Sequence, residues 1–262
     1  DEQTGKHRRF ITGNRCEKGE SMGAGTKSDV PNLFEWKSRR LFDAYEPIPA
    51  EDACGTVGIP RALNLYENYP FWFTFFTKLG YRVVLSDPST KKTYEAGIES
   101  MPSESVCYPA KLSHGHIMNL LAKEGDDAVD FIWMPCSKWE RQEDETAGNH
   151  FNCPIVASYP EALRLNIDEL RGGDVSLLTP WLPYDSKEHL KNRLFVELGQ
   201  NLAAAAGRHG APLTADEVAS AVEAAWAEDE AFKRDMRTKG VETLAWMEET
   251  GTRGIVLAGR PY

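Results

Sequence analysis

The sequence predicts an α/β fold, a Rossmann-like doubly wound and mostly parallel sheet with an added C-terminal helical hairpin. Two observations lead to it. Between residues 51 and 185, short apolar runs alternate with segments of helical periodicity, which is typical of a parallel sheet covered on both faces. Between residues 186 and 252, the sequence is almost wholly helical in character.

Short apolar segments are the expected strands of this sheet. They span residues 55–63, 81–87, 128–136, 153–160 and 174–183, of which the last is the weakest. Strands that alternate with helices are joined by right-handed crossovers and run parallel, so a sheet of about four or five strands is expected.

Helical segments lie between these strands and after them. The expected helices within the layer span residues 66–80, 108–125 and 161–170, with a short one before it at 32–45. The segment "YENYPFWFTFFTKLG" is so aromatic that it must be buried on most of its surface, and Gly80 ends it. In the hairpin, Thr214 and Glu217 form a capping box that opens the second helix.

The chain divides into four parts on this interpretation. Residues 1–50 are a lead-in arm, 51–185 the Rossmann-like layer and 186–252 the helical linker hairpin. Residues 253–262 contain the apolar run "GIVLAG" and are expected to be the first strand of a truncated second layer. The chain is therefore predicted to be an excised piece of a longer polypeptide.

Composition excludes several classes of function. The 262 residues carry 30 Lys and Arg against 40 Asp and Glu, and this net charge of -10 argues against nucleic acid as a partner. No apolar run reaches the roughly 18 residues that a membrane span needs, and the N-terminus is charged rather than signal-like. Neither a GxxxxGK[ST] nor a GxSxG motif occurs. The sequence predicts a cytoplasmic protein that does not hydrolyse nucleotides by itself.

The cysteines are the first candidates for chemistry. Five of them, at positions 16, 54, 107, 136 and 153, are too widely spaced for a disulfide-stapled domain, so free or liganding thiols are expected. Cys136 ends a predicted strand, and ligands bind beyond the carboxyl ends of parallel strands. Cys107 lies just before a predicted helix, with Ser103 and Ser105 as candidate caps, where the helix N-terminus stabilises a thiolate. Cys153 is expected to start a strand at the opposite edge, which makes it the weaker ligand.

Two readings of these thiols stay open at this point. A soft metal ligand and a buried small hydrophobe are about equally supported for Cys107 and Cys136, whereas Cys54 fits the buried hydrophobe better. Their spacing matches neither a ferredoxin-type cluster motif nor a zinc ribbon.

Charged and imidazole side chains near the same strand ends are further candidates. Lys111 lies four residues after Cys107, where its charge could favour a thiolate. Arg61 follows the first strand and could meet an anion there, or form an ordinary surface ion pair. His114 and His116 are two apart and point to different helix faces, so a solvated His114 and a packed His116 are favoured over a shared metal.

Several of these segments together resemble a known family. They include "VGIPRALNLYENYPFWFTFFTKLGYRVVLSDPS", "GIESMPSESVCYPAKLSHGHI", "DFIWMPC", "NHFNCPIVASYPE" and "GIVLAGRPY". From about residue 10 to its end the chain looks like the uncharacterised domain of large CoA-substrate-specific enzyme activase proteins. That domain belongs to the 2-hydroxyacyl-CoA dehydratase and activase group of anaerobes.

The resemblance implies a function in electron transfer. It implies activase-type, actin-like ATPase domains upstream, whose ATP hydrolysis drives a low-potential electron to a four-iron four-sulfur cluster in a dehydratase-like part. Cys107 and Cys136 correspond in order and spacing to the first two cluster cysteines of dehydratase subunits. Cys153 fits less well, because the third ligand usually comes from a later layer, and Cys16 belongs to the lead-in segment.

Two function classes follow. The first is an iron-sulfur component with Cys107, Cys136 and Cys153 as ligands and with Arg61 and Lys111 nearby, expected to be inactive as an isolated fragment. The alternative is a non-catalytic docking module that positions the ATPase domains and binds an acyl-CoA thioester or a protein. Nucleophilic chemistry at Cys107 is a third reading, which has no supporting Ser/His/Asp-like ordering.

Overall fold

The computed structural model describes residues 30–201, 212–256 and 259 of the chain. Every helix and strand given below belongs to the compact unit that begins at Leu33. Cys16 of the lead-in arm lies outside the described residues.

A parallel four-stranded sheet forms the centre of this unit. Its strands are β1 (Thr56–Ile59), β2 (Arg82–Leu85), β3 (Phe131–Trp133) and β4 (Ser176–Leu178), in the order β2-β1-β3-β4. Val57 of β1 lies opposite Val83 on one side and Phe131 on the other. The predicted parallel α/β architecture is confirmed.

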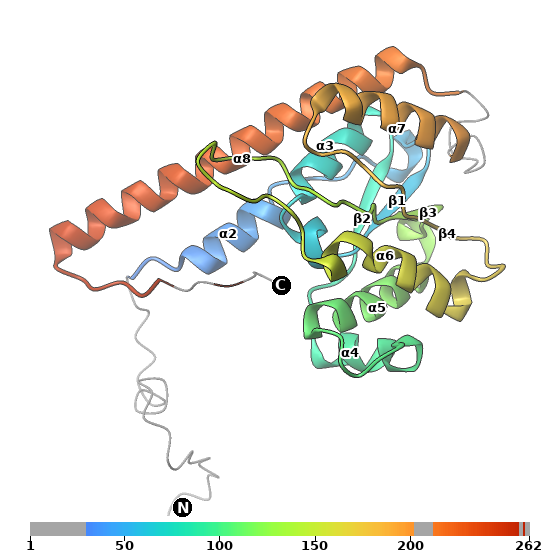
Figure 1. Ribbon diagram of the computed structural model, residues 1–262, viewed down its shortest axis with the longest axis horizontal. Coiled ribbons are helices and arrows are strands. Elements are labelled where there is room, and N and C mark those ends of the chain that lie inside the picture. Colours follow the sequence, from blue (N-terminus) through green and yellow to red (C-terminus); the bar gives the residue numbers. More distant parts are fainter. Residues whose placement is uncertain (1–29, 202–211, 257–258, 260–262) are drawn as a thin grey trace, which may run out of the picture. The chain divides into compact units, whose positions relative to one another are not determined.

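Helices cover both faces of the sheet. They are α2 (Leu33–Phe42), α3 (Tyr69–Lys78), α4 (Lys91–Gly97), α5 (Tyr108–Leu121), α6 (Pro154–Asn166), α7 (Lys187–Asn201) and α8 (Ala215–Thr250). Short 3-10 turns span Ala50–Asp52, Leu63–Tyr66, Ile98–Ser100, Gly125–Asp127 and Asp168–Leu170. Figure 1 shows α5 and α6 on one side of the sheet and α3, α7 and α8 on the other.

The predicted strand at residues 153–160 is wrong, because this segment is the first half of α6. Its buried residues Val156, Tyr159 and Leu163 are three and four positions apart, which is the spacing of one helix face and not of a strand. Pro154 occupies the first helical turn, where a missing N–H is tolerated. The apolar run therefore packs as one face of a helix.

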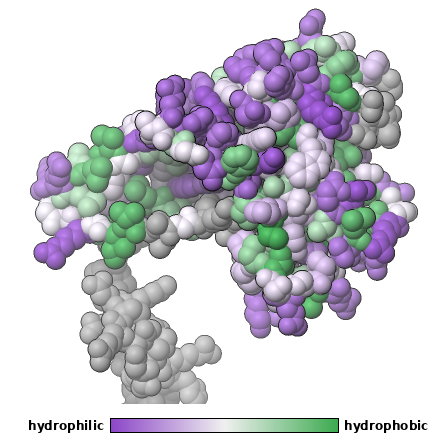
Figure 2. Space-filling view, in the orientation of Figure 1, coloured by the Kyte–Doolittle hydropathy of each residue, from purple (hydrophilic) through white to green (hydrophobic). Residues whose placement is uncertain are grey.

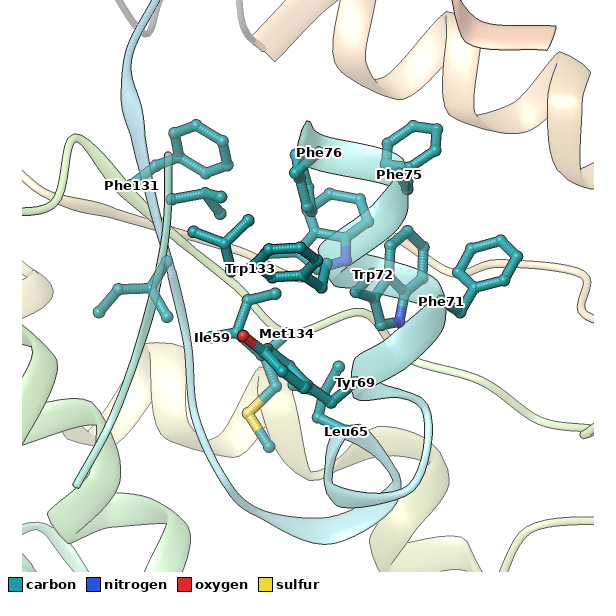
Figure 3. Packing of buried hydrophobic residues seen from close by; sticks show 14 of the residues in the cluster. Ile59, Leu65, Tyr69, Phe71, Trp72, Phe75, Phe76, Phe131, Trp133 and Met134 are labelled. Atoms are coloured by element: carbon teal, nitrogen blue, oxygen red, sulfur yellow. The ribbon is translucent and has the colours of Figure 1, made fainter. Parts of the chain in front are cut away.

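Aromatic side chains of α3 and β3 pack against one another in the core. Trp72, Phe75 and Phe76 are completely buried, and so are Phe131 and Trp133 on β3. The rings of Trp72 and Trp133 lie 5.0 Å apart at 65°, and those of Phe76 and Trp133 lie 5.4 Å apart at 78°. Figure 3 shows this contact between α3 and the sheet. Edge-to-face packing of this kind adds to the stability gained from burial alone.

The helical hairpin has the predicted cap. Thr214 accepts a hydrogen bond from the backbone of Glu217, and the Glu217 side chain accepts one from the Thr214 backbone. Gly251 ends α8 in the left-handed conformation at φ 65°. None of the described helices combines the length and the apolar character that crossing a membrane requires.

The apolar run near the end of the chain forms no strand in its described part. Ile255 and Val256 are 96% and 93% exposed and lie in no regular element. The other residues of the predicted strand at 253–262 lie mostly outside the described residues. Figure 2 shows hydrophobic surface on the elongated part of the molecule that α2 and α8 form. Phe34 of α2 and Val241 and Leu244 of α8 are among the exposed large apolar side chains.

Candidate functional site

Three cysteines lie at the carboxyl edge of the sheet. Cys136 follows β3, Cys107 immediately precedes α5, and Cys153 immediately precedes α6. Since α5 leads into β3 and α6 into β4, both helices begin at the edge where parallel strands end. The prediction that Cys153 lies at the opposite edge is wrong, because it was based on a strand that is a helix.

Cys107 and Cys153 have the same local structure. Each is the N-cap residue of its helix, at φ -63°, ψ 149° and φ -62°, ψ 148° respectively, and each is followed by a proline in the first turn. Cys107 is exposed and Cys153 is half-buried. Ser103 and Ser105 do not cap α5 as predicted, because their hydroxyls bond to one another at 2.8 Å.

Cys136 has a different environment. It extends the pairing of β3 and β4, since its N–H donates to the Pro180 carbonyl and its own carbonyl accepts from Leu182, both at 2.9 Å. Its side chain is completely buried. Burial raises the pKa of this thiol to about 12, and the nearby carboxylate of Glu161 acts in the same direction. Cys136 is therefore a neutral thiol at physiological pH.

These cysteines alone do not form a closed ligand set. In the part of the chain that the structure describes, no three His, Cys, Asp or Glu side chains are grouped closely enough to hold a metal ion. The donor chemistry suits a soft metal, because thiolates are the ligands of iron-sulfur clusters. A cluster held at this edge therefore needs further ligands or a rearrangement of those present.

Arg61 and Lys111 hold the backbone of the same edge in place. The Nε of Arg61 donates to the Ser86 carbonyl at 2.7 Å, and its guanidinium lies 4.4 Å from the ring centroid of Phe42. Burial lowers the pKa of Arg61 from its usual value. Lys111 Nζ donates to the carbonyl of Glu104 at 2.6 Å, which ties α5 to the loop before it. Lys111 therefore stabilises the loop that leads into Cys107, whereas Arg61 ties the end of β1 to the end of β2.

Both histidines of α5 are buried, so the expectation of a solvated His114 is wrong. The hydroxyls of Ser100 and Tyr159 bond the two ring nitrogens of His114 at 2.8 and 2.9 Å. The rings reach opposite sides of α5, and this helix packs against both α4 and α6. The packing of α4 and α6 on α5 explains why the His114 ring does not reach solvent, whereas the His116 ring is covered by residues that follow β2.

His116 has an equivalent pair of partners. Its ring nitrogens lie 2.8 Å from the Ser86 hydroxyl and 2.9 Å from the Ser89 hydroxyl. Burial lowers the pKa of both His114 and His116 to about 4, and the charge of Arg61 adds to this at His116. Hydroxyl partners can both donate and accept, so each neutral imidazole is satisfied without a metal.

The two histidines are expected to make the fold sensitive to acid. A histidine with a pKa near 4 when folded and near 6.5 when unfolded stabilises the protein fully above pH 6.5, and this stabilisation is lost as the pH falls toward 4. Between pH 7.5 and 5, we expect a loss of about 2 kcal/mol in the free energy of unfolding for each histidine. Urea unfolding at both pH values measures it.

A double substitution provides the control for this acid sensitivity. The variant with His114→Gln and His116→Gln has no imidazole to protonate in α5, so its free energy of unfolding should change far less over the same pH range. An equal loss in the wild type and in this variant would contradict the assignment.

The exposure of the four described cysteines predicts an order of alkylation. With iodoacetamide at pH 8, exposed Cys107 should be modified first and half-buried Cys54 and Cys153 more slowly, because reagent access differs. Buried Cys136 should react only after unfolding, since its thiol is both shielded and neutral. Peptide mapping by mass spectrometry measures the order, and native labelling of Cys136 as fast as of Cys107 would refute it.

Sequence analysis missed the carboxylate at the centre of this edge. Glu140 accepts hydrogen bonds from the side-chain amides of Asn64 and Asn68 at 3.3 Å and of Asn152 at 2.8 Å. The contact joins the loop after β1 to the loop after β3. From β1 the chain crosses to β2 on one side, and from β3 it crosses to β4 on the other side. In parallel sheets, ligands bind at the point where the crossovers diverge in this way. A cleft of about 440 Å³ opens there. The loop of residues 137–152 has no periodicity, so no pattern marked Glu140.

Comparison with known families shows the family of the chain. Residues 56–262 match the model of the family described as the CoA enzyme activase uncharacterised domain. No curated protein and no solved structure matches the chain significantly.

Proposed function

Because the chain belongs to the family of the CoA enzyme activase uncharacterised domain, we propose that its cysteines contribute ligands to a four-iron four-sulfur cluster. The cluster would serve ATP-driven, low-potential electron transfer in an activase-related protein that resembles 2-hydroxyacyl-CoA dehydratases. One observation supports the proposal: Cys107, Cys136 and Cys153 all lie at the carboxyl edge of the sheet. This follows from the topology, because Cys136 ends a strand and the other two begin helices that lead into parallel strands.

Cys107 and Cys153 are the outer ligands in this proposal. Each lies at a helix N-terminus, where unpaired backbone N–H groups favour a bound anion, and iron-bound thiolates are anionic. Cys136 is the inner ligand and must lose its proton on binding, which a coordinated metal ion brings about directly. In the structure these three cysteines are not grouped closely enough to hold a metal ion, so cluster binding in this proposal requires them to move together, and a further ligand comes from outside the described residues.

The partners in this proposal are activase-type ATPase domains that supply the electron, and an acyl-CoA is the substrate class. Lys111 holds the loop that leads into Cys107, as its bond to the Glu104 carbonyl indicates, and Arg61 ties the end of β1 to the end of β2 at the same edge of the sheet. They act on the cluster through backbone position and not by ligation.

Anaerobic reconstitution of the protein with iron and sulfide tests the proposal. Bound iron and sulfide should be measured in the wild type and in the single variants Cys107→Ala, Cys136→Ala and Cys153→Ala. Cys54→Ala is the matched control, because Cys54 lies before β1 at the amino edge, with its Sγ 3.5 Å from the Leu79 carbonyl. We expect loss of iron in the three edge variants and full iron in Cys54→Ala. A full iron content in all four variants would refute the assignment.

A docking module is the second candidate, and exposed aromatic side chains favour it. Three aromatic side chains near the cysteines are exposed, by 57% for Tyr108, 56% for Phe151 and 45% for Trp181. Tyr108 follows Cys107, Phe151 is two residues before Cys153, and Trp181 pairs with Cys136 through the backbone. Exposed aromatic residues are enriched at protein interfaces. If docking is the only function, Cys107→Ala and Cys153→Ala proteins bind the ATPase domains and support activity as the wild type does, and no iron is bound in any of them.

A further inference from the structure

The second half of α8 carries an exposed stripe of side chains. Figure 1 shows this half of the helix extending beyond the sheet. Val241 and Leu244 are 67% and 60% exposed, and Arg237 and Glu248 are exposed as well. The four positions are four, three and four residues apart, so they lie along one face of the helix. The buried residues of α8 lie between residues 218 and 232, so the described chain leaves this stripe largely uncovered.

The neighbours of α8 bind other parts of this helix. Arg40 of α2 pairs with Glu228 at 2.8 Å, on a different face of α8 from Val241. The loop after β3 reaches the beginning of the stripe, where Nη2 of Arg237 lies 3.7 Å from Oε2 of Glu143. An exposed ion pair of this length contributes little to stability. Arg237 is therefore able to turn toward another carboxylate.

The order of side chains along the stripe is self-complementary. From Arg237 to Glu248 it runs cation, apolar, apolar, anion. When two such helices lie antiparallel about a twofold axis, Arg237 of each copy lies opposite Glu248 of the other, and Val241 lies opposite Leu244. The spacing of four, three and four residues is that of alternating a and d positions in a heptad repeat, which pack between paired helices. A second copy of the chain therefore matches this stripe in both charge and apolar character.

The end of α8 fits the same arrangement. The helix ends at Thr250, and Gly251 follows it in the left-handed conformation. About the same twofold axis, Thr250 of one copy lies opposite Asp235 of the other. Phe232 is the last buried residue of α8. The two helices therefore overlap only over their exposed parts, and each ends before it reaches the buried half of the other.

We propose that the chain forms a homodimer in which two copies of α8 pack antiparallel through this stripe. Val241 and Leu244 exclude water at the centre, and the Arg237–Glu248 pairs on both sides fix the direction and register of the helices. Because only two apolar layers are buried, the dimer is weak, with a Kd on the order of 100 μM. The stripe contains no cysteine, so Cys107→Ala should dimerise as the wild type does, whatever the outcome for the cluster.

Sedimentation equilibrium of the purified chain, from about 10 μM to about 1 mM, tests the apolar part of the interface. We expect the average mass of the wild type to rise toward that of a dimer over this range. Leu244→Glu should weaken the dimer by about 10-fold or more, because it buries a carboxylate against Val241 of the other copy. Leu165→Glu is the matched control and should dimerise as the wild type does, since Leu165 is 57% exposed on α6, away from the stripe.

A charge exchange tests the direction of the helices. Arg237→Glu and Glu248→Arg each place like charges opposite one another twice in the interface, so each should weaken the dimer by about 10-fold. The variant with both substitutions restores opposite charges and should dimerise as the wild type does. A wild type that stays monomeric at the highest concentration would overturn the proposal and leave the stripe to a different protein. Wild-type dimerisation of Leu244→Glu, or a double variant no tighter than the single ones, would also overturn it.

Discussion

Replacement of Trp72 by alanine is expected to lower the free energy of unfolding by about 4 kcal/mol, which is typical of a large aromatic residue removed from a core. Trp72 is completely buried at the contact between α3 and the sheet. Its ring lies within 6.1 Å of those of Phe75, Phe76, Trp133 and Tyr184, measured between centroids. These neighbours come from three segments, so the cavity cannot close by the movement of one side chain.

A smaller substitution at the same position provides the control. Trp72→Phe keeps an aromatic ring in the site and should lose about 1–2 kcal/mol, because a smaller cavity remains. Guanidinium unfolding followed by far-ultraviolet circular dichroism measures both variants. A loss below 1 kcal/mol in Trp72→Ala would show that α3 does not anchor the core as described.

Replacement of Gly115 by alanine is expected to have the second largest effect. An added Cβ would lie 1.7 Å from the carbonyl oxygen of Thr93 and 2.6 Å from its carbonyl carbon, so α4 and α5 could not keep their present separation. Gly97 makes the reciprocal contact, since a Cβ there would lie 2.6 Å from the N of Gly115. The backbone of Thr93 cannot move aside as a flexible side chain can. We therefore expect Gly115→Ala to lower the free energy of unfolding by about 3 kcal/mol.

Replacement of Gly240 by alanine is expected to have the opposite effect on the free energy of unfolding. Gly240 lies within α8, and an added Cβ would meet no atom within 4 Å. Gly240→Ala should therefore raise the free energy of unfolding by about 0.5–1 kcal/mol, the difference in helix propensity. Chemical unfolding of both variants measures the contrast, and equal stabilities of Gly115→Ala and Gly240→Ala would contradict the close packing of α4 on α5.

Local patterns were sufficient to predict most of the fold. The aromatic run of α3, the alternation of strands and helices and the capping box at Thr214 and Glu217 each depend on residues near one another in sequence. The wrong strand at residues 153–160 shows the limit of this reasoning. A short apolar run suits a buried strand or a buried helix, and only the spacing of Val156, Tyr159 and Leu163 separates the two.

The candidate site was predictable only in part. The positions of Cys107 and Cys136 at the ends of elements follow from the sequence, whereas that of Cys153 depended on the element assigned to it. The burial of His114 could not be predicted, because it results from α4 and α6 packing on both sides of α5. The cleft beside Glu140 is lined by loops after two different strands, and such loops carry no periodic signal.

Diffraction from crystals of the anaerobically reconstituted protein, recorded at the iron absorption edge, tests the central claim most directly. We expect an anomalous peak at the carboxyl edge of the sheet, in contact with the sulfurs of Cys107, Cys136 and Cys153. An iron peak away from this edge, or iron bound without contact to any of the three sulfurs, would contradict the claim.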